Sequence, residues 1–408
     1  MLTRHCDKSS RPFSDILSVL LPTSRQTSFL RACLYSGDAG REASEAWLCQ
    51  GDATKDDLKD EGVKSLLPLL FSACQRNKVE VDTEFLTLLR TASLREELRT
   101  KTYRRICQNV LSTLTAAGMP IIALKGAVLA ETVYDHPALR HSHDIDILLG
   151  ENDPSRALSL LSSLGFAPLR PAGDPEWQNI QFIHQSGLPL ALHHHPFHVP
   201  LHNAAQADMW ARSQTQVVAD VPVRTLSPAD ALLHLCGHAS YCPSRTSLRW
   251  VCDAWFLIER YPSLDWDILL DCVVRSRLAL PLSVMLGYVA EELRAPIPAT
   301  FLDRLRTAAS QSNTIERELA LWGVRAGGRI RFKNLVRMPH DWRTRAFVLK
   351  WLFLPSPAYL RSVRQIPRAW PLAFFYAYRP LQYVLRCARL RRQSYLRGKD
   401  KPLLEEPS

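Results

Sequence analysis

Hydrophobic residues in the first part of the chain recur every three to four positions, which is the period of an amphipathic helix. The pattern is clear within residues 85–89 and again within residues 106–114. It predicts helices across residues 14–118, and the last of these ends where Gly118 and Pro120 interrupt the pattern.

After residue 120 the hydrophobic residues form short runs separated by turn residues, a pattern that is typical of strands. Residues 121–124 are expected to form a strand, residues 125–126 a turn and residues 127–134 a short helix. The run at 144–149 is expected to form a second strand. The next expected elements are a helix at 155–164 that ends at Gly165 and strands at 178–184, 188–193 and 221–226.

The helical period returns at residue 227 and continues to about residue 323. Helical stretches on either side of a group of strands predict an α+β fold, with a small mixed β-sheet core flanked by N-terminal and C-terminal helical regions. The expected parts are an N-terminal helical region at 1–100, an α/β core at 101–226, a helical domain at 227–325 and a basic, aromatic-rich region at 326–408.

The composition favours several packed domains over a disordered chain. The 408 residues are 46% hydrophobic and 22% charged. No hydrophobic run reaches the roughly 18 residues that a transmembrane helix needs, so we expect a cytoplasmic protein without a transmembrane segment. The ten cysteines include no C-x-x-C pair, which favours reduced thiols over a disulfide scaffold.

Positive charge is concentrated in the last quarter of the chain. The net charge is +11, and residues 325–401 contain 19 Lys or Arg against two Asp. This region is expected either to contact an acidic acceptor, a nucleic acid or a membrane surface, or to expose arginines on the solvated face of amphipathic helices. The solvated arginine face is the preferred interpretation. The region lacks an RNA-binding signature and lacks a regular alternation of aromatic and basic residues.

The candidate chemistry lies at the start of the second expected strand, in Asp144-Ile145-Asp146. Side chains alternate along a strand, so Asp144 and Asp146 point to the same face while Ile145 enters the core. Two converging carboxylates suit a Mg²⁺ or Mn²⁺ ion that carries the phosphates of a nucleoside triphosphate. Alone the motif is a weak signal, because acidic residues also occur at solvated strand ends.

The strand, turn and helix before this motif strengthen the interpretation. Lys125 offers an ammonium group, Gly126 lets the backbone approach a ligand, and the following helix presents an electropositive N-terminus to a phosphate. Arg140 adds a cation that can bind phosphate oxygens as a fork, and a salt bridge to Asp135 is its alternative role.

Together these residues resemble an uncharacterised bacterial family of nucleotidyltransferases in the polymerase-beta-like superfamily. The shared pattern is L-K-G-x-x-L, a tyrosine, R-x-x-x-D-I-D-h-L with h apolar, and a helix that ends in G-F. It stands here as Leu124, Lys125, Gly126, Leu129, Tyr134, Arg140, Asp144, Ile145, Asp146, Leu148, Gly165 and Phe166. The likeness continues in the stretches 234–239, 248–253 and 264–267, and covers about residues 60–310.

The resemblance implies transfer of a nucleoside monophosphate from a magnesium-bound nucleoside triphosphate to a hydroxyl, phosphate or amine. Asp144 and Asp146 would then hold the metal. Lys125 and Gly126 would bind the phosphates, and Arg140 would steady the triphosphate. The acceptor stays open between a small molecule, a peptide, a saccharide and an RNA.

The chain departs from the family pattern at Ala191, where the family carries a third carboxylate on a later strand. His193 lies two residues further on, hence on the same face of a regular strand, and is the candidate proton acceptor. A hydrogen-bonded framework histidine is the alternative. The missing carboxylate also leaves open a catalytically degenerate nucleotide-binding module, and the basic region leaves open an adaptor for an acidic surface.

Two groups of histidines and cysteines invite a metal-site interpretation that their spacing disfavours. Neighbouring strand residues face opposite ways, and Cys236 points away from His234 and His238 on a helix. Packing within the fold is preferred for the helical group, and Asp253 is interpreted as an internal hydrogen-bond anchor. The two groups are His193, His194, His195 and His198, and His234, Cys236, His238 and Cys242.

Overall fold

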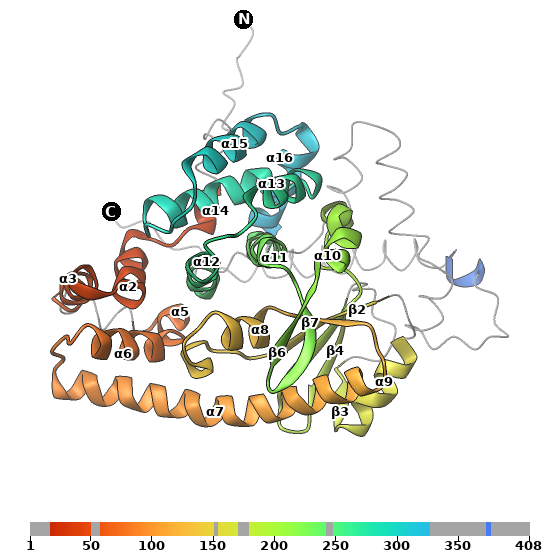
Figure 1. The fold of residues 1–408 in the computed structure, drawn as a ribbon, viewed down its shortest axis with the longest axis horizontal. Coiled ribbons are helices and arrows are strands. Elements are labelled where there is room, and N and C mark those ends of the chain that lie inside the picture. The colour runs from red at the N-terminus through yellow and green to blue at the C-terminus, as the bar shows by residue number, and fades with distance from the viewer. Residues whose placement is uncertain are drawn as a thin grey trace, which may run out of the picture. The chain divides into compact units, whose positions relative to one another are not determined.

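The computed structural model describes residues 17–49, 58–150, 154–169, 179–241, 248–326 and 373–376. The described residues up to 326 belong to one compact unit, and residues 373–376 belong to a second. In the first unit helices flank a seven-stranded mixed sheet, which confirms the predicted α+β class (Figure 1). Most of the basic region at 326–408 lies outside the described residues, and so does Cys242.

The N-terminal part of the unit is helical, as predicted. Its elements are η1 (Ser18–Leu20), α2 (Ser24–Leu34), α3 (Gly37–Leu48), α5 (Glu61–Lys64), α6 (Leu67–Arg76) and α7 (Thr83–Ala116). Asp82 begins α7 by accepting the Phe85 backbone N–H at 2.9 Å, and Gly118, with a φ of 67°, turns the chain at its end. Helix α7 runs through residue 100, so the predicted domain boundary there falls within a continuous helix.

The sheet has the order β3-β4-β5-β2-β1-β7-β6. Neighbouring strands are antiparallel except in two pairs, β1 with β7 and β2 with β5, which are parallel. Five strands match the prediction, whereas β3 and β6 were not predicted. The strands are β1 (Ile121–Leu124), β2 (Ile145–Leu149), β3 (Phe166–Pro168), β4 (Asn179–His184), β5 (Pro189–His193), β6 (Gln214–Val218) and β7 (Val221–Thr225).

Helices connect the strands and then form the C-terminal part of the unit. Figure 1 shows the later helices gathered on the side of the sheet away from α7. The connecting elements are α8 (Lys125–Thr132), η2 (Pro137–Leu139), α9 (Pro154–Ser163), η3 (Pro200–Ala205) and α10 (Gln206–Arg212). The later helices are α11 (Pro228–Tyr241), α12 (Arg249–Arg260), α13 (Trp266–Arg275), α14 (Ala279–Glu291), α15 (Ala299–Ser310) and α16 (Thr314–Ala326).

The two faces of the sheet have different roles. Ile145, Ile147 and Leu149 of β2 are buried in a hydrophobic core with side chains of α7 and α9. Because side chains alternate, Asp146 points to the opposite face. The same holds for β5, where Leu190 and Leu192 enter this core and the residues between and after them face the other way. The candidate site therefore lies on the face away from the second half of α7, residues 103–114, while the first half of α7 reaches past the sheet and lines the cavity.

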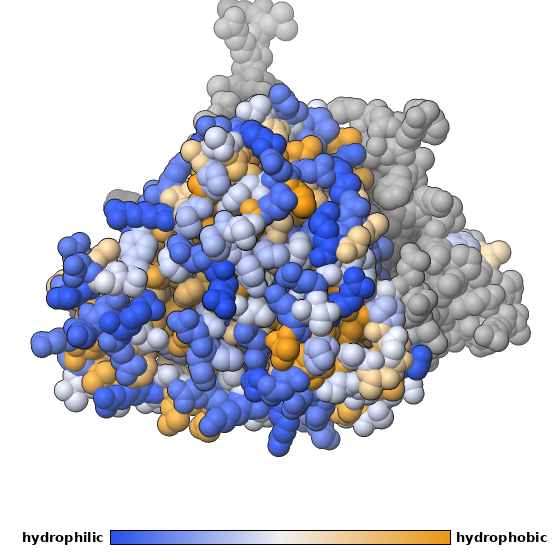
Figure 2. All heavy atoms as spheres, viewed as in Figure 1, coloured by the Kyte–Doolittle hydropathy of each residue, from blue (hydrophilic) through white to orange (hydrophobic). Residues whose placement is uncertain are grey.

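The surface and the cysteines agree with the composition. Figure 2 shows hydrophilic residues over much of the visible face, with smaller hydrophobic patches among them. Within the described ranges, no helix is both long enough and apolar enough to cross a bilayer. The seven cysteines in those ranges are free thiols, and six of them are buried.

Candidate active site

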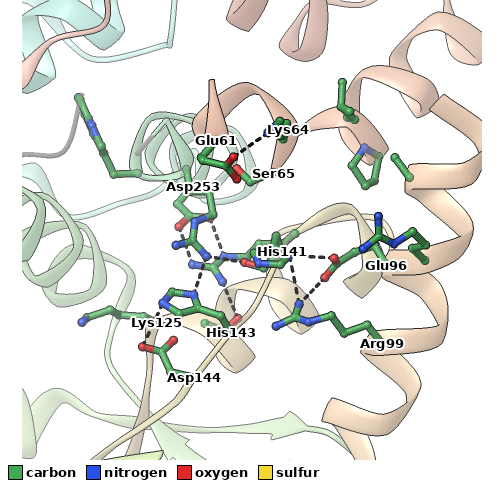
Figure 3. A pocket seen from close by; sticks show the side chains of 18 of the residues that line it. Glu61, Lys64, Ser65, Glu96, Arg99, Lys125, His141, His143, Asp144 and Asp253 are labelled. Atoms are coloured by element: carbon green, nitrogen blue, oxygen red, sulfur yellow. Dashed lines mark hydrogen bonds and ion pairs between the residues drawn. The ribbon is translucent and has the colours of Figure 1, made fainter. Parts of the chain in front are cut away.

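The two carboxylates predicted from the sequence line one cavity of about 1400 Å³. Asp144 directly precedes β2, and its side chain is 35% exposed. Asp146 is the second residue of β2, and its side chain is only 8% exposed. The alternation of the strand thus brings both carboxylates to one cavity, where Figure 3 shows Asp144 close to Lys125 and His143.

Asp146 is held as a carboxylate by two neighbours. Its Oδ2 lies 3.4 Å from the Lys125 ammonium, and its Oδ1 lies 2.7 Å from Nε2 of His193. Burial alone would raise the pKa of Asp146, but Lys125 and the hydrogen bond from His193 outweigh it and hold the pKa well below its ordinary value. Asp146 therefore carries its negative charge at neutral pH.

His193 and Ala191 occupy the face that the sequence predicted. The strand register pairs Ala191 with Asp146 and His193 with Leu148. Since the carboxylate of Asp146 only accepts, Nε2 of His193 carries the hydrogen and donates it. His193 therefore supports a predicted metal ligand directly, and a methyl group stands beside Asp146 where a third carboxylate was expected.

Lys125 and Gly126 mark a direct change from strand to helix. Helix α8 begins at Lys125, which follows β1 without a linker and has a φ of 35°. This left-handed conformation costs a residue with a side chain roughly 1–3 kcal/mol, and such strain concentrates at functional sites. A Cβ on Gly126 would lie 3.4 Å from Nη1 of Arg140 and 3.5 Å from the Asp144 carbonyl oxygen. These are ordinary van der Waals distances, so the contact with Arg140 does not by itself require glycine at residue 126.

Arg140 directs all three guanidinium nitrogens to the protein itself. Nε and Nη2 each donate to the Asp253 carboxylate at 2.8 Å, while Nη1 donates to the Gly126 carbonyl oxygen and to Ser142. Tyr134 donates to the same carboxylate at 2.8 Å. Asp253 is therefore an internal anchor, as interpreted from the sequence, and the partner of Arg140 is Asp253 rather than Asp135.

Arg249 is a cation of this cavity that the sequence did not single out. Its Nη1 lies 2.7 Å from the His141 carbonyl oxygen and 2.8 Å from Nδ1 of His143. Burial lowers the pKa of Arg249, and the nearby charge of Arg140 lowers it further. Its two hydrogen-bond partners carry no formal negative charge, and the carboxylates of Asp253 and Asp144 act on it only from a distance, so Arg249 can direct positive charge to a ligand in the cavity.

Helix α7 holds the loop that carries Asp144. Along one face of α7, Arg99 donates to the Ser142 carbonyl oxygen at 2.5 Å, and the Tyr103 hydroxyl donates to the Asp144 carbonyl oxygen at 2.9 Å. One turn before Arg99, Glu96 lies 2.8 Å from Nδ1 of His141. The backbone that positions the first carboxylate is therefore fixed from outside the sheet.

Comparison with known proteins identifies the family. A family model described as "Uncharacterised nucleotidyltransferase" matches residues 63–294, which is more than half of the chain. The chain belongs to this family. The match confirms the resemblance drawn from the L-K-G and D-I-D motifs, and it extends from the N-terminal helices through α14. No curated protein matches the chain.

The two groups of histidines and cysteines lie within the described residues, except for Cys242. No cluster of three or more His, Cys, Asp or Glu in the described residues has a geometry that could hold a metal ion. His234 is buried and lies 3.1 Å from the Pro196 carbonyl oxygen, which is a framework contact. Packing, the preferred interpretation for the helical group, agrees with this arrangement.

Three further residues that line the cavity were not predicted from the sequence: Glu96, His141 and Arg249. Arg249 lies within the stretch 248–253 that carries part of the family likeness, so a signal for it was present. Glu96 looks like an ordinary polar residue of a helix surface, and nothing in its spacing links it to a loop that lies 45 residues later.

Proposed function

We propose that the protein transfers a nucleoside monophosphate from a magnesium-bound nucleoside triphosphate to an acceptor. The observation that carries the proposal is the shared cavity, whose charged lining brings Asp144 and Asp146 together with Lys125 and Arg249. Carboxylate oxygens fit Mg²⁺ or Mn²⁺, which is commonly held by one or two carboxylates together with substrate phosphates. Asp144 and Asp146 would hold the ion, and Lys125 and Arg249 are the neighbouring cations.

The carboxylates and the ion have separate tasks. When bound, the ion would neutralise phosphate charge and polarise the α-phosphate. Asp146 is already ionised through Lys125 and His193, so it needs to lose no proton when a cation arrives. Asp144 is more exposed, so its carboxylate is open to an incoming ion.

The phosphates are assigned to Lys125, to the backbone at Gly126 and to Arg249. Lys125 is 13% exposed at the start of α8, where the helix dipole also favours an anion. Arg249 supplies the charge that the sequence analysis assigned to Arg140. Arg140 itself would act on the nucleotide by holding the Gly126 carbonyl and the loop before Asp144 in place.

The test measures binding and transfer separately. Binding of each nucleoside triphosphate with Mg²⁺ is measured by calorimetry, and transfer is followed with α-labelled triphosphates and a cell extract as the source of acceptors. Asp144→Asn and Asp146→Asn are each expected to weaken magnesium-dependent binding by tenfold or more, about 1.4 kcal/mol. Asp271→Asn, an exposed carboxylate on α13, is the matched control. Unchanged affinity in both site variants would reject the site.

A nucleotide-binding module without transfer is the second candidate function. It is favoured by one observation, the methyl group of Ala191 beside Asp146 in the register of β2 and β5. The same experiment separates the two candidates. Magnesium-dependent binding without transfer to any acceptor supports the module, and transfer of label supports the enzyme.

A further inference from the structure

Glu96 of α7 and His141 of the loop before β2 form a partly buried pair on the wall of the cavity. Glu96 Oε2 lies 2.8 Å from Nδ1 of His141, and Glu96 Oε1 accepts a hydrogen bond from Arg99 at 2.8 Å. The Glu96 side chain is 10% exposed and the His141 side chain 31% exposed. Glu96 is therefore withdrawn from solvent, while part of the imidazole of His141 reaches the cavity.

The contact with Glu96 decides which nitrogen of His141 carries the hydrogen. An ionised carboxylate only accepts, so Nδ1 must be the donor, although Arg99 also lies 3.1 Å from this nitrogen. In neutral His141 the lone pair is then on Nε2. Within the described ranges no residue hydrogen-bonds Nε2, so this atom is available to accept a proton.

His141 lies close to the carboxylates that would hold the metal. Its ring stacks on the ring of His143, with centroids 6.3 Å apart and an angle of 10° between the planes. Nε2 of His143 is in turn 3.6 Å from Asp144. Figure 3 shows His141 between Glu96 and Arg99 on one side and Lys125 and Asp144 on the other.

We propose that His141, oriented by Glu96, is the general base of this nucleotidyltransferase and that the acceptor is a hydroxyl compound. This inference rests on the proposed function. A phosphate acceptor is already an anion at neutral pH and needs no base, whereas a hydroxyl must lose its proton as it attacks. A base in the loop before β2 also supplies what the missing carboxylate at Ala191 would have supplied on β5.

The proposed step balances in atoms and charge. The acceptor oxygen forms a bond to the α-phosphorus as its proton moves to Nε2 of His141. The bond between the α-phosphorus and the oxygen that bridges to the β-phosphate breaks, and pyrophosphate leaves with that electron pair. The negative charge of Glu96 stabilises the imidazolium that results, and Arg99 keeps Glu96 in place.

A purely structural role predicts a different result. If Glu96 and His141 only fasten the loop to α7, their loss lowers stability and nucleotide affinity together. If His141 is the base, its loss lowers transfer while binding persists, and a free imidazole that enters the vacated space restores part of the rate. Chemical rescue therefore distinguishes a general base from a residue that only attaches the loop to α7.

The experiment uses the full chain, Mg²⁺ and α-labelled triphosphates, with glycerol, inorganic phosphate and a cell extract offered as acceptors. His141→Ala is expected to lower transfer to hydroxyl compounds by about 10²–10⁴-fold at unchanged triphosphate affinity, and added imidazole is expected to restore part of it. His141→Gln and Glu96→Gln are tested in parallel in case the alanine variant does not fold. His184→Gln is the control, since His184 lies on β4 and bonds to Ser186.

Each outcome bears on one proposal. Reduced transfer with rescue supports the base. Equal transfer by wild type and His141 variants, use of phosphate alone as acceptor, or magnesium-dependent binding with no transfer at all each overturns it. A wild-type protein that binds no triphosphate overturns the proposed function instead.

Discussion

Ala191 sets the amount of negative charge around the proposed metal. It pairs in register with Asp146 across two parallel strands, so its side chain lies on the same face as the carboxylate. Ala191 is partly exposed, so a longer side chain can be placed at this position. The proposed metal site therefore has two carboxylates, and a third at residue 191 would lie on the same face as Asp146.

We predict that Ala191→Asp strengthens Mg²⁺ or Mn²⁺ binding by about tenfold, ~1.4 kcal/mol, because it adds a ligand charge next to Asp146. Calorimetric titration of the metal measures this directly. Ala191→Asn is the control, because asparagine has nearly the same volume as aspartate and carries no charge. Equal metal affinity in the two variants would show that residue 191 does not face the metal.

The part of the site that is local in sequence could be predicted, and the part assembled from distant segments could not. Asp144 and Asp146 are two residues apart, so the alternation of one strand decides their arrangement. The partner of Arg140 lies 113 residues away in α12. The hydrophobic periodicity of a single helix or strand does not predict contacts over such a separation in sequence. For that reason Arg140 was assigned to phosphate, whereas in the structure Nε and Nη2 donate to Asp253 and Nη1 donates to Gly126 and Ser142.

Among the secondary-structure elements, the helix α12 and the loop around η2 depend on one buried ion pair. The side chains of Arg140 and Asp253 are 8% and 2% exposed. Burial alone would lower the pKa of Arg140, but Asp253 outweighs it and keeps the guanidinium charged. The two hydrogen bonds of the pair join segments from the sheet core and the later helices.

We predict that Asp253→Asn lowers the free energy of unfolding by about 3–5 kcal/mol, because it leaves the Arg140 guanidinium buried without its counter-charge. Urea denaturation followed by circular dichroism gives the value. Asp267→Asn, which breaks an exposed pair with Arg304, is expected to cost less than about 1 kcal/mol. Similar losses in the two variants would contradict a special role for the buried pair.

Elements with a strong hydrophobic period were predicted well, and the two strands at the edges of the sheet were not. Strand β6 alternates Gln214, Thr215, Gln216 and Val217, and its outer side chains are exposed, so little hydrophobic pattern remains. Strand β3 has only three residues and ends at Pro168, below the length at which alternation can be recognised. Strand β3 is held by pairing with β4, and strand β6 is held by pairing with β7. These pairings form only in the folded chain.

At the scale of the whole molecule, buried histidines make stability depend on pH. His202 is fully buried, with Nδ1 donating to the Ser276 carbonyl oxygen at 2.6 Å and Nε2 accepting from Tyr241. Burial lowers the pKa of His202 to about 4, and burial also holds the pKa of His234 well below its ordinary value. Unfolding exposes both rings to water, where they bind protons near pH 6.5.

We predict that the free energy of unfolding falls as the pH is lowered from about 6.5 to about 4, since the unfolded chain binds more protons in this window. His202 alone contributes a loss of up to roughly 3 kcal/mol. Urea titrations at several pH values measure the slope of the free energy of unfolding against pH. His202→Gln is expected to reduce this slope by about 1.4 kcal/mol per pH unit. An identical slope in the variant would show that His202 titrates normally in the folded protein.

The separation of 113 residues between Arg140 and Asp253 has a consequence for the protein as it is synthesised. Helix α7 and strands β1 and β2 leave the ribosome before α12. They contain most of the residues that position Asp144 and Asp146. Arg249 and Asp253 follow after about 6–23 s of translation, at roughly 5–20 residues per second. Until α12 emerges, the nascent chain lacks the cation assigned to the triphosphate and the counter-charge of Arg140. The order of synthesis thus delays a complete nucleotide site until the later helices can fold.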